Sequence, residues 1–140
     1  MKHFEVVCAI IENENGEIFI SKRGPGRALQ NKCEFPGGKV EENETHEETI
    51  IREIKEELNS KIKPIKYIGK SYYEYTNLSP YNDFSITLYS YLSKLVEGKL
   101  ELSEHIDSKF VSLDKLTSFD FAEADKPLIK MLIEEKRLKF

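Results

Sequence analysis

Glutamates gather in one short stretch of this 140-residue chain, in a pattern that could bind metal ions. From Glu34 to Leu58 nine glutamates stand against three basic residues, whereas the other 115 residues carry 18 bases and 16 acids. On a helix turning about 100° per residue, Glu53, Glu56 and Glu57 fall within an arc of about 100°. Carboxylate oxygens suit hard cations such as Mg²⁺ or Mn²⁺. The pattern predicts either a cation site or a solvated acidic helix face.

A helix carrying these glutamates is predicted to begin near Thr45 and to end at Leu58. The run Thr45-His46-Glu47-Glu48 matches a capping box, in which the threonine hydroxyl and the carboxylate three residues later satisfy backbone N–H groups. Asn59 tolerates a left-handed backbone and is the expected stop. Arg52 is expected to form helix salt bridges with Glu48 and Glu56. The buried stripe borders the glutamates and is expected to contain Ile50, Ile51, Ile54 and Leu58.

The glutamates belong to a longer pattern: Gly, five residues, Glu, seven residues, Arg-Glu, an aliphatic residue, any residue and Glu-Glu. Its members are Gly38, Glu44, Arg52, Glu53, Ile54, Glu56 and Glu57. This pattern resembles the Nudix box, with seven of nine defined positions in agreement. The family has Gly where Asn59 stands and an aliphatic residue where Ser60 stands. We expect the first departure to be harmless and the second to weaken packing after the helix slightly.

Similarity to the MutT-like branch of the Nudix hydrolases extends over essentially the whole chain and implies a metal site. The implied catalytic residues are Arg52, Glu53, Glu56, Glu57 and Glu104. The implied ligands are the same glutamates and the Gly37 carbonyl, with Glu44 supporting them from outside the ligand shell. Glu104 is the positional match to a family glutamate that reaches the metal, and an exposed loop glutamate is the alternative.

The resemblance also implies a nucleotide site. Its expected members are Arg23, Glu34, Phe35, Gly38, Lys39 and Asp125. Arg23 and Lys39 would neutralise phosphates, and glycine backbone at Gly37 and Gly38 would permit a close approach to a ligand such as the triphosphate, or to another strand. Solvated loop residues are the alternative for both bases.

Asp125 differs from relatives specific for 8-oxoguanine, which place Asn there, and matches CTP-hydrolysing members of the branch. An ionised Asp only accepts hydrogen bonds and would favour the amino group of cytosine. A raised pKa would let it donate and admit oxidised guanine. A third possibility is that Asp125 only caps the last helix, two residues before Pro127.

The strands and helices that must position these residues alternate along the chain. This order indicates a mixed sheet with helices on its faces. The expected strands are 4–12, 17–21, 65–75, 84–92 and 109–112, with a last helix over 125–136. That helix is expected to bury Leu128, Met131, Leu132 and Leu138. Strand tyrosines are expected to pack, or in some cases to stack on a base; these are Tyr72, Tyr73, Tyr75, Tyr81, Tyr89 and Tyr91. The resemblance implies an α/β/α sandwich with a central mixed β-sheet, one domain over 1–140.

Composition agrees with a folded domain. Apolar residues make up 39% of the chain, and no apolar run approaches the roughly 20 residues of a membrane span. We expect a cytoplasmic monomer without a signal peptide, with Cys8 and Cys33 unbridged and no nucleic acid polymer as partner. The resemblance implies a Mg²⁺-dependent hydrolase that converts nucleoside triphosphates such as 8-oxo-dGTP to monophosphate and pyrophosphate. The alternatives are a (d)CTP pyrophosphohydrolase, a nucleoside diphosphate sugar or ADP-ribose hydrolase, and a non-catalytic ligand-binding module.

Overall fold

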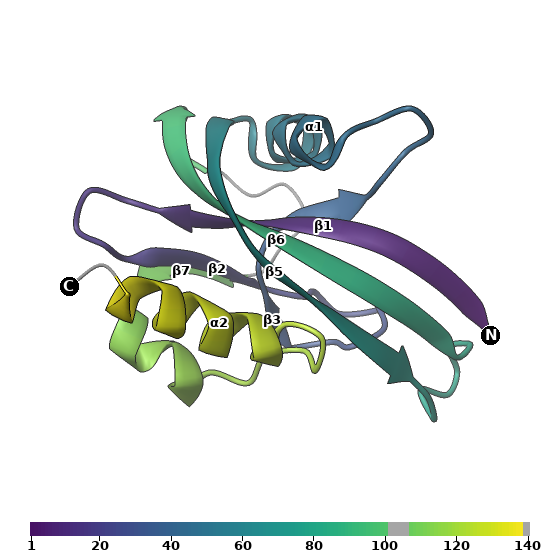
Figure 1. Ribbon diagram of the computed structural model, residues 1–140. Helices are drawn as coiled ribbons and strands as arrows, with labels where there is room; N and C mark the ends of the chain where they lie inside the picture. The colour runs from purple at the N-terminus through teal and green to yellow at the C-terminus, as the bar shows by residue number, and fades with distance from the viewer. Residues whose placement is uncertain (101–106, 139–140) are drawn as a thin grey trace.

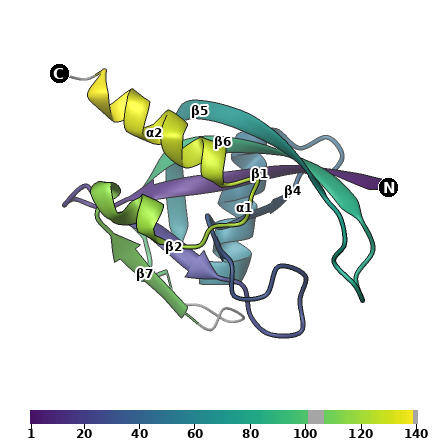
Figure 2. The same ribbon diagram turned by 90° about the horizontal axis from the view of Figure 1, so that it is seen from below.

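A curled mixed sheet lies between two helices in the computed structural model, which describes residues 1–100 and 107–138 (Figure 1). The strands are β1 (Lys2–Glu12), β2 (Ile18–Lys22), β3 (Cys33–Glu34), β4 (Gly37–Lys39), β5 (Lys61–Tyr75), β6 (Phe84–Glu97) and β7 (Asp107–Val111). The helices are α1 (His46–Leu58), the short 3₁₀ helix η1 (Leu113–Ser118) and α2 (Lys126–Arg137). Seen from below, α1 lies behind the sheet and α2 in front of it (Figure 2). The predicted α/β/α sandwich is confirmed.

The strand order along the sheet is β3-β2-β1-β6-β5, with β4 added to β1 and β7 added to β2. The pair β1 and β6 is parallel from Lys2 and Phe84 to Glu12 and Lys94, and the other pairs are antiparallel. The sheet is therefore mixed, as predicted. Its two end strands, β3 and β5, lie on opposite sides of the central pair.

The position of β1 between the two helices explains why its sequence is apolar at consecutive positions. Val7, Ala9 and Ile11 pack with the apolar residues of α1, whereas Cys8 and Ile10 pack with those of α2. Successive side chains of a strand point to opposite faces, so a strand covered on both faces needs apolar residues throughout. This central strand therefore anchors both helices.

The ends of α1 follow the predicted signals. The Glu48 N–H donates to the Thr45 hydroxyl oxygen (3.1 Å), and the Thr45 N–H donates to the Glu48 carboxylate (2.9 Å), which completes the capping box. Asn59 ends the helix in the left-handed region, with φ 46° and ψ 41°. The substitution of Gly by Asn at this position therefore leaves the helix stop intact.

Three packing expectations were wrong. Ile51 is 38% exposed because it lies at the far margin of the apolar arc, and Leu138 is 81% exposed because α2 ends at the residue before it. Ser60 does not weaken the packing after α1. It is buried, its hydroxyl donates to the Leu58 carbonyl (2.8 Å), and it accepts from the Leu100 N–H (2.8 Å). A polar contact replaces the expected apolar one.

Other differences concern lengths and short elements. Strand β5 begins four residues earlier than predicted and β6 continues five residues further. Strands β3 and β4 and helix η1 were not predicted, because two to six residues carry too little periodicity. Both cysteines are free and buried, and Cys33 lies in β3. Within residues 1–100 and 107–138, no helix is long and apolar enough to cross a membrane.

Candidate active site

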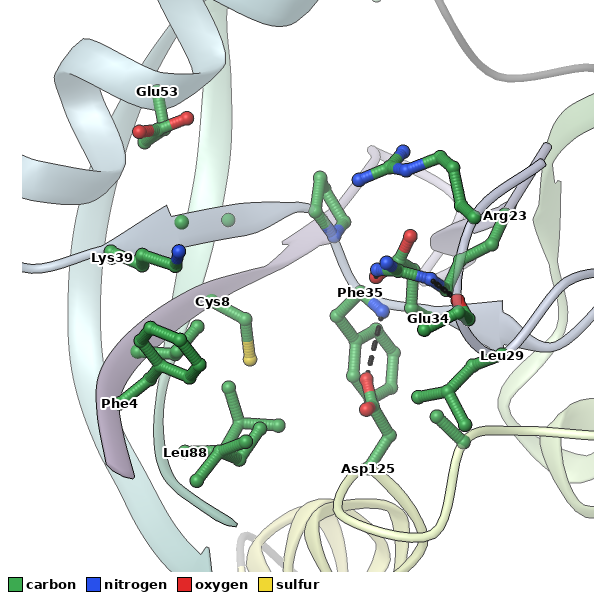
Figure 3. Close-up of a pocket in the computed structure, with 18 of the residues that line it drawn as sticks. Phe4, Cys8, Arg23, Leu29, Glu34, Phe35, Lys39, Glu53, Leu88 and Asp125 are labelled. Atoms are coloured by element: carbon green, nitrogen blue, oxygen red, sulfur yellow. Dashed lines mark hydrogen bonds and ion pairs between the residues drawn. The ribbon is translucent and has the colours of Figure 1, made fainter. Parts of the chain in front are cut away.

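A cavity of about 570 Å³ lies on one face of the sheet and joins most of the predicted site residues. Figure 3 shows Glu53 on α1 at one end and Asp125, just before α2, at the other, with Phe35 between them. Cys8 on β1 and Leu88 on β6 form part of the wall. The cavity therefore has a carboxylate end and a largely apolar end.

Glycines 37 and 38 are required by packing at the carboxylate end. A Cβ on Gly37 would lie 2.1 Å from the Val7 carbonyl oxygen, and one on Gly38 would lie 2.3 Å from the Glu53 carboxylate carbon. The sequence predicted that these glycines allow a close approach of a ligand, such as a triphosphate, or of another strand. At Gly37 the close neighbour is the backbone of β1, which confirms the approach of another strand, whereas at Gly38 it is the Glu53 side chain, which a Cβ would displace. Both glycines also line the cavity.

Arg52 fixes the carboxylates around it. Its guanidinium donates to both carboxylate oxygens of Glu44 (2.7 and 3.0 Å), to Glu53 (2.9 Å) and, at 3.4 Å, to Glu56. The predicted contact with Glu56 is present, but Glu44 and Glu53 take the place of Glu48, which is engaged in the capping box. A planar guanidinium with several donors suits this bridging role.

Glu44 is held ionised by its neighbours. The hydrogen bonds from Arg52, and then the one from the Thr49 hydroxyl (2.7 Å), lower its pKa to about 2. Thr49 is fully buried on α1, although the predicted buried stripe did not include it. This arrangement places Glu44 behind the carboxylates, in agreement with the expected supporting role.

Glu53 and Glu57 both line the cavity, one helical turn apart. Burial, and then the adjacent Glu53, raise the pKa of Glu57 well above its usual range. Two carboxylates crowded in this way favour a proton or a cation between them. The donor set thus fits a hard divalent cation.

The third carboxylate of the predicted metal site lies apart from this pair. Glu56 is 60% exposed, contacts Arg52 and does not line the cavity. Among the described residues, no three His, Cys, Asp or Glu side chains are gathered closely enough to hold a metal ion. Glu104 lies outside the described residues. The full ligand set therefore stays a prediction.

Basic side chains surround the cavity beside β3. Arg23 donates to the Ala28 carbonyl oxygen (2.7 Å) and to the Glu34 carboxylate (3.1 Å). Lys39 is exposed, with its Nζ 4.0 Å from the centre of the Phe4 ring. Arg27 also lines the cavity. It was not selected as a site residue, although it lies in the same connection between β2 and β3 as Arg23.

Asp125 closes the apolar end and is 5% exposed. Its Oδ2 accepts from the Phe35 N–H (3.0 Å), shown as a dashed line in Figure 3. Burial, and then Glu34, raise the pKa of Asp125 to about 8 against the lowering effects of the Phe35 N–H and Arg23. Near neutral pH it is therefore mainly a carboxylic acid, which both donates and accepts hydrogen bonds.

The capping hypothesis for Asp125 is wrong. The residue occupies the N-cap position of α2, but its side chain makes no capping hydrogen bond. Its carboxyl group points into the cavity toward Phe35 (Figure 3).

Some wall residues were not predicted. Among the predicted strand tyrosines only Tyr75 lines the cavity, with Phe4, Phe84 and Ile86 from neighbouring strands. Phe35 itself packs against Phe121, with ring centres 5.2 Å apart. The alternation of side chains along a strand could have indicated the side of the sheet on which these residues lie. It could not have indicated that, among the described residues, no helix covers this part of the sheet and a cavity forms there.

Known proteins share this sequence pattern. The NUDIX domain model matches residues 1–132. An 8-oxo-dGTP diphosphatase of Escherichia coli K12 is 36% identical over 132 residues, which cover 94% of this chain and 98% of that protein. A CTP pyrophosphohydrolase of the same organism is 30% identical over 130 residues, covering 93% and 91%.

Solved structures share the fold as well. The solution structure of the E. coli ORF135 protein superposes with a TM-score of 0.81 at 29% identity, covering 97% of this chain and 92% of that one. The crystal structure of a MutT protein from Methanosarcina mazei Go1 gives a TM-score of 0.77 at 26% identity, covering 96% of both chains. The chain therefore belongs to the Nudix family of hydrolases, which cleave phosphoanhydride bonds in nucleotides.

Proposed function

We propose that this Nudix hydrolase converts 8-oxo-dGTP and similar oxidised purine nucleotides to the monophosphate and pyrophosphate. The observation that carries this proposal is the cavity, which has paired carboxylates at one end and a buried acid at the other. A protonated Asp125 offers a donor to a base carbonyl and an acceptor to a base N–H, as an amide would. The relative named 8-oxo-dGTP diphosphatase supports the same substrate class.

The carboxylate end is proposed to hold Mg²⁺ or Mn²⁺. Glu53 and Glu57 would bind it from the cavity wall, joined by Glu56 from the same arc of α1, by the Gly37 carbonyl and by Glu104. A bound cation neutralises phosphate oxygens and makes a water molecule a better nucleophile at neutral pH. Nudix hydrolases depend on divalent cations in general, which supports this assignment.

The remaining site residues are proposed to orient the metal-binding carboxylates and to neutralise the substrate phosphates. Arg52 holds Glu53 in a fixed position, and Glu44 balances the charge of Arg52 from behind. Arg23 and Lys39, together with Arg27, would neutralise the phosphates. Glu34 and Phe35 would form the edge of the base site, next to Asp125.

A second candidate substrate is CTP or dCTP. It is favoured by Asp instead of Asn at position 125, since an ionised carboxylate accepts from the amino group of cytosine. The relative named CTP pyrophosphohydrolase supports it. We infer that both substrates are free nucleotides and that the protein acts as a cytoplasmic monomer of one domain.

A panel of nucleotides assayed with Mg²⁺ at pH 7 tests the proposal. We expect pyrophosphate release, with the highest kcat/KM for 8-oxo-dGTP among nucleoside triphosphates. A variant with Glu53→Gln, which keeps the side-chain shape and removes a ligand charge, is the control for contaminating phosphatase. Release of orthophosphate alone, or a clear preference for ADP-ribose, would contradict the proposal.

A further inference from the structure

The segment 120–125 spans the cavity side of the sheet from one end strand toward the other. At its start it is bonded to β3: the Cys33 N–H donates to the Asp120 carbonyl (2.8 Å) and the Ala122 N–H donates to the Cys33 carbonyl (3.0 Å). At its end it reaches β5, the strand at the opposite end of the order. Asp125 is the last residue of this segment, so both end strands determine where its carboxyl group lies.

Two hydroxyl groups of β5 hold the residue just before Asp125. The Ala124 N–H donates to the Tyr75 hydroxyl oxygen (2.8 Å), and the Ser71 hydroxyl donates to the Ala124 carbonyl oxygen. All three residues are buried. The carbonyl of Ala124 belongs to the peptide group that it shares with Asp125, so these bonds fix the backbone from which the Asp125 side chain departs.

Tyr75 is itself well positioned for this task. Its ring lines the cavity and stacks on Phe84, with ring centres 5.1 Å apart, which leaves the hydroxyl little freedom to move. Side chains that support a binding group in this way control its position within fractions of an ångström.

We propose that Tyr75 and Ser71 are positioning residues for nucleobase specificity: they hold Ala124 so that the Asp125 carboxyl reaches the Phe35 N–H at the end of the cavity. This inference rests on the proposed function, because specificity is measured on nucleotides. Neither residue is assigned a role in the chemistry at the carboxylate end.

The first test compares Tyr75→Phe with Tyr73→Phe. Tyr75→Phe keeps the ring and removes the acceptor for the Ala124 N–H. Tyr73 is its matched control, because it is an exposed neighbour on the same strand, outside the cavity. We expect Tyr75→Phe to reduce the ratio of kcat/KM for 8-oxo-dGTP to that for CTP about tenfold, through KM rather than kcat. Tyr73→Phe should leave the ratio unchanged.

The second test reads Asp125 directly, without turnover. In ligand-free protein labelled with ¹³C at the aspartate carboxyls, we expect Tyr75→Phe to lower the pKa of Asp125 by about one unit or more, as the loosened segment admits water. The charged and titratable groups that face Asp125 are Glu34 on β3, Arg23 after β2, Cys8 on β1 and Tyr75 itself. Of these groups only Tyr75 is changed, so a shift in the pKa of Asp125 reports the effect of the Tyr75 hydroxyl on the environment of Asp125.

These readouts separate the inference from the proposed function. If no nucleoside triphosphate is hydrolysed, the proposed function fails, whereas the titration still tests the positioning role. A Tyr75→Phe protein that melts earlier, but keeps both the substrate ratio and the Asp125 titration, would overturn the inference. If Tyr75→Phe does not fold, Ser71→Ala removes the second bond alone, and it must lower the ratio and the Asp125 pKa for the inference to stand.

Discussion

Raising the pH from 7 to 9 should shift substrate preference from oxidised guanine toward cytosine, because Asp125 loses its proton in this range. Its pKa is about 8, so roughly 90% of the protein carries the acid form at pH 7 and roughly 10% at pH 9. The acid form can donate to a base carbonyl, and the ionised form only accepts. The ratio of kcat/KM for 8-oxo-dGTP to that for CTP should therefore fall about tenfold, equivalent to about 1.4 kcal/mol.

The assay follows both substrates in competition from pH 6 to pH 9.5, roughly centred on the pKa of Asp125. Competition cancels ionisations at the carboxylate end, such as that of Glu57, since both substrates use the same chemistry there. Asp125→Asn should abolish the pH dependence and raise the ratio tenfold or more at pH 9, because the amide donates at every pH. Asp120→Asn is the control, since Asp120 is an exposed carboxylate paired with Lys32.

A ratio that stays constant across this range in the unchanged protein would refute the reasoning, as would the same slope in Asp125→Asn. Stability gives an independent check of the sign. The folded protein keeps the Asp125 proton up to about pH 8, whereas the unfolded chain loses it near its ordinary value of 3.8. The contribution of Asp125 to stability therefore declines between these values. Asp125→Asn should raise the melting temperature at pH 8 more than at pH 4.

Four further outcomes are expected. Glu53→Gln or Glu57→Gln should lower kcat more than tenfold at saturating Mg²⁺ without lowering the melting temperature, since each relieves the crowding of the two carboxyl groups. Gly38→Ala should lower both activity and stability, the latter by about 1–3 kcal/mol in unfolding experiments, because its Cβ meets the Glu53 carboxylate. Glu44→Gln should raise the Mg²⁺ concentration needed for half-maximal activity, since Arg52 is then free to bind Glu53 more strongly. Glu104→Gln should lower kcat less than Glu53→Gln; an unchanged kcat and pH profile would return Glu104 to an exposed loop role.

Local signals predicted the helix α1 well. The capping box at Thr45 and the stop at Asn59 depend on residues no more than a few positions apart, and both appear as predicted. The same holds for the contact between Arg52 and Glu56 at i, i+4. Short-range geometry is fixed by the helix itself, so spacing was sufficient for these features. The equally spaced contact of Arg52 with Glu48 was predicted too, but Glu48 completes the capping box instead.

Signals that depend on distant neighbours could not be interpreted from spacing. Gly37 and Gly38 were expected to allow a close approach of a ligand or of another strand, but spacing did not reveal that β1 and the Glu53 side chain are the close neighbours. Ser60 was expected to be a packing defect, but Leu100, 40 residues later, supplies its hydrogen bond. In both cases the residue type indicated a special contact, but the residue that makes this contact lies too far away along the chain to be predicted.

The protonation state of Asp125 is the property that sequence could least reveal. Comparison with Asn suggested a preference for cytosine, which holds only for an ionised carboxylate. Whether it is ionised depends on burial and on Glu34 and Phe35, about 90 residues away in the chain. Folding brings these groups together through β3 and the segment 120–125. The same aspartate can therefore act as an amide-like group near pH 7 and as a carboxylate near pH 9, so its specificity follows from the cavity more than from the side chain alone.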